Sequence, residues 1–179
     1  MKEAGDIAAN SMASEHSNDR FVADDFAVPE GLASQEFRLR MLTVNDVIKD
    51  YDAVMSSAEH LQSVWPDSGW PEGLTIEQNL IDLGWHQKEF QNRSSFAYTM
   101  VTLSESRVIG CVYIYPTSAQ GYDSEVYLWV RASELHGDLD SRLFDTVQKW
   151  LAKDWPFRNP AFPGREIGWK EWESVNCKD

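Results

Sequence analysis

Two consecutive segments rich in β-branched and aromatic residues constrain the fold of this chain more than any other feature. They cover residues 96–103 (FAYTMVTL) and 108–115 (VIGCVYIY), and only the four residues SESR separate them. Residues of these types favour strands, and so short a connection is typical of a β-hairpin. A third segment of the same kind, EVYLWVR at 125–131, follows after a loop. The sequence therefore predicts three consecutive antiparallel strands at the centre of a sheet.

Segments with other periodicities flank these strands. Apolar and polar residues alternate over 37–42, which predicts a further strand. Apolar residues recur at helical spacing over 47–64, over 75–92 after the capping-box sequence TIEQ, and over 139–151. A last short strand is expected at 165–169. This order of elements predicts an α/β (α+β) fold, in which helices flank a mixed, mostly antiparallel central sheet.

The length of 179 residues suits one domain with short extensions. Residues 1–34 carry two basic and seven acidic side chains, and few large apolar ones precede Phe21. Because the first twenty positions cannot bury enough apolar surface to offset the entropy of ordering, we expect an acidic, partly disordered N-terminal arm. The folded domain is expected over residues 35–172, and a C-terminal tail over residues 173–179.

Charge and composition exclude several classes of function. The formal net charge is −13, with no run of lysine and arginine, so a nucleic-acid partner, which requires a basic face, is not expected. No stretch approaches the ~18 consecutive apolar residues of a membrane span, and the N-terminal sequence lacks the pattern of a secretory signal. The four histidines and two cysteines show neither metal-ligand spacing nor a disulfide pattern. We expect a cytoplasmic protein without a metal and without membrane contact.

Three stretches and the order of the elements resemble the GNAT superfamily of acyl-CoA-dependent N-acetyltransferases. FRLRMLTVNDVIKDYDAVM is similar to the first strand and helix of that family, and SRVIGCVYIYP is similar to its central hairpin. EVYLWVR, with the loop and amphipathic helix that follow, is similar to the strand and helix that hold coenzyme A. The resemblance spans roughly residues 35–170 and implies a GNAT-like fold. It also implies that strand 125–131 is central and diverges from one neighbour, where the pantetheine arm of the donor enters.

The main motif of the family is a turn of the form Arg or Gln, two residues, Gly, one residue, Gly or Ala. Glycines let backbone N–H groups approach a pyrophosphate, whose charge the helix N-terminus favours. The corresponding stretch here is RASELHGDLDSRLF at 131–144, which places Asp138 and Asp140 at the two glycine positions and leaves only Gly137 nearby. The resemblance therefore implies that acetyl-CoA binds as the acyl donor, but weakly. The implied cofactor-binding residues are Trp129, Val130, Arg131, Gly137, Asp138, Leu139, Asp140, Ser141 and Arg142.

The same aspartates have a purely structural interpretation. Asp138 suits the N-cap of the helix, and Asp140 in its first turn suits the helix dipole. In that case the two carboxylates occupy the place that a pyrophosphate would use. Arg131, Arg142 and His136 are the positive or protonatable groups that would compensate in part.

Strand alternation separates a polar face from an apolar face in the two neighbouring strands. One side carries Cys111, Tyr113 and Tyr115 together with Glu125, Tyr127, Trp129 and Arg131. The other side carries Val108, Val112 and Ile114 together with Val126, Leu128 and Val130. We expect packing against a helix on the apolar side and chemistry on the other.

N-acetyl transfer needs a base that takes a proton from an ammonium and donors for the developing oxyanion. A central Glu125 among aromatic rings would have a pKa raised by desolvation, which suits a general base, although a strand-start residue facing water is the alternative. His86 and Glu89 on the helix at 75–92 could line an acceptor pocket, or lie on a solvated flank. The candidate catalytic residues are Glu125, Tyr115 and His86, and the candidate substrate-binding residues are Tyr113, Tyr127 and Glu89.

These observations favour an N-acetyltransferase that transfers an acetyl group directly to the amine of a small molecule. The alternative is a catalytically silent GNAT-fold protein, a binding or interaction module that has lost coenzyme A binding. The polar sheet face supports the enzyme, and the two aspartates support the alternative. The sequence leaves open whether the chain forms a homodimer.

Overall fold

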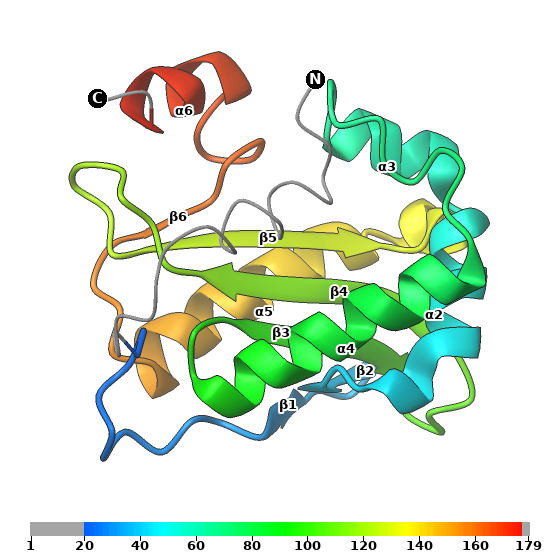
Figure 1. Ribbon diagram of the computed structural model, residues 1–179, viewed down its shortest axis with the longest axis horizontal. Coiled ribbons are helices and arrows are strands. Elements are labelled where there is room, and N and C mark those ends of the chain that lie inside the picture. The colour runs from blue at the N-terminus through cyan, green and yellow to red at the C-terminus, as the bar shows by residue number, and fades with distance from the viewer. Residues whose placement is uncertain (1–19, 177–179) are drawn as a thin grey trace.

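Six strands form one sheet in the order in which they occur along the chain (Figure 1). The computed structural model describes residues 20–176, so the prediction of disorder for the first twenty positions concerns residues that, except for Arg20, lie outside this range. Neighbouring strands are antiparallel except for the last pair, which is parallel. The strands are β1 (Gly31–Ala33), β2 (Phe37–Met41), β3 (Phe96–Thr102), β4 (Val108–Tyr115), β5 (Ser124–Val130) and β6 (Pro160–Ala161). The predicted mixed, mostly antiparallel sheet is confirmed.

Helices cover both faces of this sheet. In Figure 1, α2 and α4 cross one face, α5 lies behind the other, and α3 and α6 stand beyond β5 and β6. The helices are α2 (Val47–Met55), α3 (Ala58–Val64), α4 (Ile76–Asn92), α5 (Leu139–Asp154) and α6 (Trp169–Asn176), with the 3-10 turns η2 (Val44–Asp46) and η3 (Ala132–Gly137). None of the helices within residues 20–176 is long and apolar enough to cross a membrane.

Two local predictions need correction. The helix expected over 47–64 is broken into α2 and α3, because Ser56 turns its hydroxyl back to the carbonyl of Ala53 at 3.2 Å and the chain bends at Ser57. The short strand expected at 165–169 is also wrong, since Gly164, with a φ of 77°, makes a tight turn there. The strand lies earlier, in β6, and Trp169 instead begins α6.

A β-bulge alters the faces of the β3–β4 hairpin. The pairing of the two strands shifts between Met100 and Val101, and Val108 accordingly packs on the side of α2 and α4 while Ile109 packs on the side of α5. Strict alternation predicted the opposite for Val108, because one extra residue in a strand reverses every side chain beyond it.

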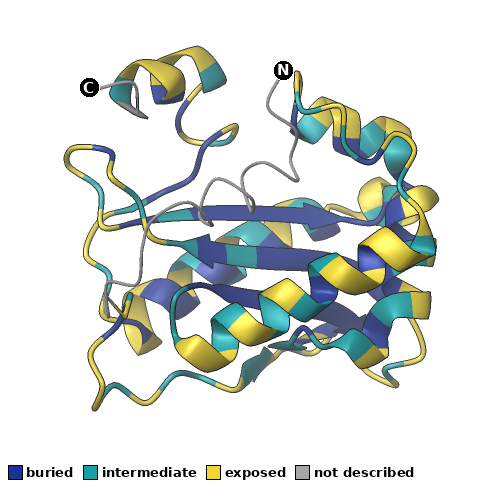
Figure 2. Ribbon diagram, in the orientation of Figure 1, coloured by how far each residue is buried: buried dark blue, intermediate teal, exposed yellow. Residues whose placement is uncertain are grey.

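Each face of the sheet has its own core. The larger core joins α5 to the apolar residues of β2–β5, and the second joins α2–α4 to the opposite face of β3–β5. Figure 2 shows that β3, β4 and β5 are buried almost throughout, whereas the outer faces of α2 and α4 are exposed. The segment 20–34 adds to the first core. The buried hydroxyl of Tyr98 donates to the carbonyl of Pro29 at 2.6 Å, and Arg93 donates to the carbonyl of Phe26 at 2.6 Å.

The strands β5 and β6 pair over a short distance and then diverge. Only Ser124 with Pro160 and Glu125 with Ala161 are in register. Proline lacks the backbone N–H that continued pairing requires, and Pro163 follows soon after. Beyond Glu125 the edge of β5 is therefore not paired with β6. The structure confirms that this strand diverges from one neighbour. It is not central, because β5 is the fifth of six strands and only the two residues of β6 pair on its outer side.

Candidate active site

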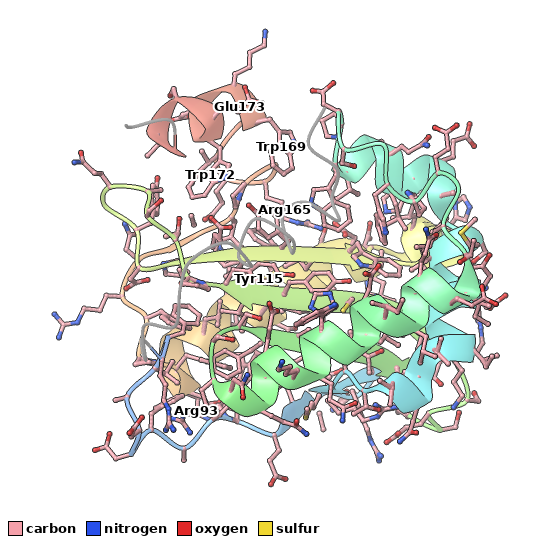
Figure 3. The ribbon with its side chains drawn as sticks, in the orientation of Figure 1. Arg93, Tyr115, Arg165, Trp169, Trp172 and Glu173 are labelled. Atoms are coloured by element: carbon pink, nitrogen blue, oxygen red, sulfur yellow. The ribbon has the colours of Figure 1, made fainter. Side chains whose placement is uncertain are left out.

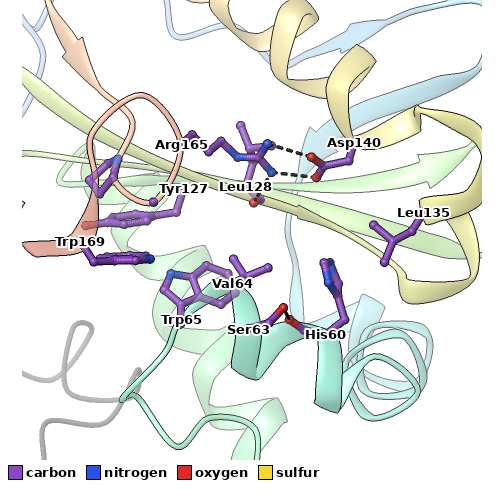
Figure 4. A pocket seen from close by; sticks show the side chains of 12 residues that line it. His60, Ser63, Val64, Trp65, Tyr127, Leu128, Leu135, Asp140, Arg165 and Trp169 are labelled. Carbon is purple, nitrogen blue, oxygen red and sulfur yellow. Dashed lines mark hydrogen bonds and ion pairs between the residues drawn. The ribbon is translucent and has the colours of Figure 1, made fainter.

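A cavity of about 260 Å³ lies where β6 leaves β5. One wall comes from α3 and the residue that follows it, with His60, Ser63 and Trp65 (Figure 4). Tyr127 of β5 and Arg165 of the loop between β6 and α6 lie opposite. The cavity thus joins residues 60–65 to residues between 127 and 169 at the unpaired edge of the sheet.

An ion pair crosses this cavity from the β6 side to the β5 side. The guanidinium of Arg165 donates to both carboxylate oxygens of Asp140, at 2.7 and 2.8 Å. One of its nitrogens also donates to the backbone carbonyl of Leu128 in β5, at 3.2 Å. Arg165 therefore bridges the edge of β5 and the first turn of α5, and both partners of the pair remain partly accessible to solvent.

His60 contributes an imidazole to the wall of the cavity. Burial lowers the pKa of its imidazole, and the charge of Asp140 offsets this only in part. Its Nε2 atom is buried and has no hydrogen-bond partner in the described part of the chain. The imidazole is therefore mainly neutral near pH 7, and one nitrogen is free to accept or donate a proton.

Three tyrosines cover the neighbouring face of β4 and β5. Tyr113 stacks on Tyr115 with ring centroids 6.1 Å apart, and Tyr115 lies 6.2 Å from Tyr127. Tyr127 in turn stacks on Trp169 of α6, and Figure 3 shows Tyr115 over the sheet and Trp169 farther up, next to α6. This tyrosine cluster (Tyr113, Tyr115 and Tyr127) adjoins the cavity through Tyr127, whose ring lines it.

Glu125 lies at the start of β5, opposite Tyr115 in the register of the sheet. Burial raises the pKa of its carboxyl to about 7, against hydrogen bonds with Thr117 and Tyr127 that favour the charged form. It is half-buried, and it is not a simple water-facing residue at a strand start. A carboxyl with this pKa exchanges protons readily at neutral pH.

The helix α4 brings two predicted residues to the same cluster. The ring of His86 lies 5.3 Å from that of Tyr113, and burial lowers the pKa of His86 to about 4. The side chain of Glu89 accepts a hydrogen bond from Ser95 at 2.7 Å, and burial raises the pKa of Glu89 while that bond lowers it. His86 Nδ1 and Glu89 Oε2 are 3.9 Å apart, too far for a hydrogen bond. Both side chains face the sheet and not a solvated flank.

The residues predicted around the cofactor turn are dispersed. Arg131 is buried and pairs with Asp52 at 2.7 Å, and Arg142 pairs with Glu36 at 2.8 Å. Asp138 occupies the N-cap position in a left-handed conformation with a φ of 55°, but its side chain makes no capping hydrogen bond. Of the rest, Trp129, Val130 and Leu139 are buried in the cores, and Gly137 and Ser141 are exposed.

Asp140 is the predicted cofactor residue that lines the cavity, and its partner Arg165 was not indicated by any sequence pattern. Arg165 and His60 reach the site through turns and helix breaks that periodicity does not reveal. The segment around Arg165 was predicted as a strand, and His60 lies beside, not in, the apolar stripe of its helix. The Pro-Gly pair at 163–164 was the one available signal for a turn that presents Arg165.

The described residues contain no group of three or more His, Cys, Asp or Glu side chains that could hold a metal ion. The site accordingly rests on aromatic rings, two carboxyls in apolar surroundings, two imidazoles and one arginine.

No family model and no curated protein matches the sequence. Solved structures of acetyltransferases do match the fold. The ribosomal-protein-S5-alanine acetyltransferase from Vibrio fischeri superposes with a TM-score of 0.57 at 14% identity, over 69% of this chain and 67% of that one. RimL, a ribosomal L7/L12 alpha-N-protein acetyltransferase in complex with coenzyme A, gives 0.55 at 15% identity, over 72% and 70%. The microcin C7 self-immunity acetyltransferase MccE, in complex with acetyl-CoA and AMP, gives 0.56 at 10% identity, over 72% and 71%. The chain has the fold of the GNAT acetyltransferases.

Proposed function

We propose that this protein is an acyl-CoA-dependent N-acyltransferase that moves an acetyl group from acetyl-CoA to an amine. The observation that carries the proposal is the divergence of β5 from β6 around a cavity of about 260 Å³. An unpaired strand edge offers backbone groups to an extended ligand, and the cavity beside it gives the acyl group a place among Tyr127, Trp65 and Trp169.

The donor side of the site fits acetyl-CoA in shape and only in part in charge. The carbonyl of Leu128 on the open edge of β5 can accept from an amide of a pantetheine arm, and the N-terminus of α5 suits a phosphate. Asp140 opposes a phosphate by its charge, whereas Arg165 favours one. Bound acetyl-CoA would supply the thioester carbonyl. The residues that would hold it are Leu128, through its backbone, and Arg165.

The acceptor side is the tyrosine cluster. A primary amine must lose a proton before or during attack, and Glu125, with a pKa of about 7, is the group suited to take it. Tyr127 connects this carboxyl to the cavity, because its ring lines the cavity and its side chain lowers the raised pKa of Glu125. The amine nitrogen forms a bond to the acyl carbon, the carbon–sulfur bond breaks, and the amine proton passes through the Tyr127 hydroxyl to Glu125.

Tyr115 and His86 complete the site as neutral groups. Burial, and then the charge of Glu89, raise the pKa of Tyr115 well above its ordinary value. Its hydroxyl therefore stays protonated and can donate a hydrogen bond to a leaving thiolate. His86 is uncharged because of its lowered pKa and can accept from the acceptor amine. The acceptor is either a small-molecule amine or a protein α-amino group. The second class is the one in the name of the structural neighbour RimL, an alpha-N-protein acetyltransferase.

The test is an acetylation assay on the full chain. Thiol release from acetyl-CoA and product mass are followed with free amino acids, aliphatic diamines and peptides with a free N-terminus. We expect acetylation in at least one class, and its loss in Glu125→Gln and Tyr127→Phe with donor binding unchanged. Turnover that is equal in both variants and the native chain would reject the proposed base and relay.

A second candidate is a catalytically silent protein of the same fold. One observation favours it: Arg165 already bonds to the Leu128 carbonyl and to Asp140, where the donor would bind. On this alternative neither the native chain nor Asp140→Asn binds coenzyme A at millimolar concentration, and no amine is acetylated.

A further inference from the structure

The Arg165–Asp140 pair has an unusual position for an ion pair. It spans the gap between β6 and β5 and uses three hydrogen bonds, two to the carboxylate and one to the backbone of β5. The side chains of Arg165 and Asp140 are 22% and 31% exposed, so the pair is neither fully buried nor fully exposed to solvent. Figure 4 shows it on the side of the cavity opposite the wall formed by α3.

The backbone on both sides of the pair is fixed. Arg165 follows Gly164, and its N–H donates to the carbonyl of Phe162 at 3.2 Å. Its guanidinium lies 5.3 Å from the ring centroid of Phe144 on α5, a cation–π arrangement. Asp140 sits in the first turn of a helix of 16 residues. A rearrangement of the pair therefore needs rotation of two side chains and no movement of either element.

The charges at this place are largely offset while the pair is closed. The guanidinium carries one positive charge and the N-terminus of α5 about half of one, and the Asp140 carboxylate offsets most of this sum. A phosphate has the same bidentate geometry toward arginine as a carboxylate. It can therefore replace Asp140 on Arg165 without loss of hydrogen bonds, while Asp140 turns to solvent.

We propose that Arg165 is the phosphate-binding side chain of this protein and that Asp140 holds it closed across the donor site until a phosphate of coenzyme A replaces the carboxylate. The proposal rests on the proposed function only in that coenzyme A is the ligand. In this chain an arginine from the far side of the cavity does the work for which the related family uses glycines in the turn before the helix. This exchange of carboxylate for phosphate on Arg165 sets the affinity for coenzyme A, because every binding event must break the Arg165–Asp140 contact.

The exchange predicts opposite effects for the two partners. Asp140→Asn keeps the shape and a hydrogen-bond acceptor but removes the competing charge, so coenzyme A should bind about tenfold more tightly, the equivalent of one charge-assisted hydrogen bond. Arg165→Gln should weaken coenzyme A by a similar factor. Pantetheine, which lacks the phosphates, should bind the native chain and Asp140→Asn within about twofold of each other.

Two variants control for general electrostatics. Asp145→Asn removes an exposed carboxylate from the same helix. Lys149→Gln removes an exposed ammonium farther along the same helix. Neither should change the affinity for coenzyme A more than about twofold, since exposed charges are screened. Asp140→Ser serves as a second variant, and melting temperature and circular dichroism establish that each variant is folded.

Isothermal titration of the full chain with coenzyme A, dephospho-coenzyme A and pantetheine distinguishes the outcomes. Tighter coenzyme A binding in Asp140→Asn and Asp140→Ser, weaker binding in Arg165→Gln and unchanged pantetheine binding support the proposal. Equal affinities for coenzyme A in Asp140→Asn, Asp145→Asn and the native chain overturn it and leave the proposed function standing. Binding with the expected pattern but without acetylation of any amine supports the exchange and rejects the acyltransferase. No binding by any variant overturns both.

Discussion

Tyr127 of β5 and Trp169 of α6 stack with nearly parallel rings, whose centroids are 6.2 Å apart and whose planes are at 8°. Trp169 rests in turn on Gly164, where an added Cβ atom would lie 2.8 Å from three atoms of the indole ring. The turn after β6 therefore holds the aromatic stack against the open edge of β5. This contact sets the width of the cavity and connects the position of Arg165 to that of Tyr127.

The close approach at Gly164 can be tested against a matched glycine. Gly73 has a φ of 74°, close to the 77° of Gly164, but no atom lies within 4 Å of an added Cβ there. Alanine at position 73 should cost about 1–2 kcal/mol of unfolding free energy from the left-handed backbone alone. Gly164→Ala should cost about 1–3 kcal/mol more, because the indole must move. Urea unfolding measures both, and equal losses would contradict the contact.

The pH dependence of the reaction tests the role of Glu125. In the proposed mechanism the base form of Glu125 is the active one, so kcat/KM should rise with pH and level off above about pH 7, the pKa to which burial raises this carboxyl. In Glu125→Gln the remaining rate should be low and lack this rise. Glu89→Gln is the control, because Glu89 lies on the other side of the tyrosine cluster. A rise near pH 7 that disappears in Glu89→Gln and persists in Glu125→Gln would assign the base to Glu89.

Much of the sheet and of the polar face could be predicted, because a period of two residues fixes both. Tyr113 and Tyr127 are directly opposite each other in the register, as alternation along their two strands requires. Val108 was assigned to the wrong face because the bulge near Met100 adds a residue that no local pattern marks. Sequence periodicity thus predicts the side of a strand as long as the pairing is regular.

The contacts that close the site could not be predicted. Arg165 and Asp140 are 25 positions apart and meet only because β6 turns away from β5. Neither residue has a periodicity that signals the other, and the turn at Gly164 interrupts the segment in which a strand was expected. His60 likewise depends on the break between α2 and α3, which Ser56 and Ser57 produce. Such contacts follow from tertiary structure and not from propensity.

The buried carboxyl of Asp50 in α2 predicts a stability that falls as pH rises. It is 4% exposed and accepts a hydrogen bond from Asn79 at 2.9 Å, and burial raises its pKa to about 6. Since the unfolded chain ionises this group at lower pH, the cost of folding grows from about pH 4 to pH 6 and is constant above that range. Asp50→Asn removes this cost, because its amide can still pair with Asn79.

Asp50→Asn should therefore gain stability relative to the native chain between pH 4 and pH 7, by at most about 3 kcal/mol for a shift of two pKa units. Urea unfolding at both pH values measures the gain, and Asp145→Asn on the exposed side of α5 is the control. A gain that is the same at both pH values would mean that Asp50 keeps an ordinary pKa in the folded protein.

The ion pair between Arg40 of β2 and Asp46 of η2 predicts the opposite pH dependence. Two guanidinium nitrogens of Arg40 donate to Asp46, at 2.7 and 3.0 Å, and a third donates to Glu105 at 2.9 Å. The Asp46 side chain is only 5% exposed. Burial alone would raise the pKa of Asp46, but hydrogen bonds from Arg40 and Thr43 hold it below its ordinary value. This pair stabilises the fold above the unfolded pKa and loses its effect as pH falls.

Removing one partner leaves the other buried and unpaired. Arg40→Met should cost about 3–5 kcal/mol of unfolding free energy at pH 7. The neighbouring Arg38 is half exposed and lies 3.4 Å from Glu105, so Arg38→Met should cost less than about 1 kcal/mol. The double variant Arg40→Met/Asp46→Asn should recover a large part of the loss, because no buried charge remains. The deficit of Arg40→Met should also shrink as pH falls from 7 to 4, where Asp46 in the variant becomes protonated. Urea unfolding across this range measures the loss of unfolding free energy. If that loss is independent of pH and of the second substitution, it comes from lost packing of the Arg40 side chain and not from the charge of Asp46.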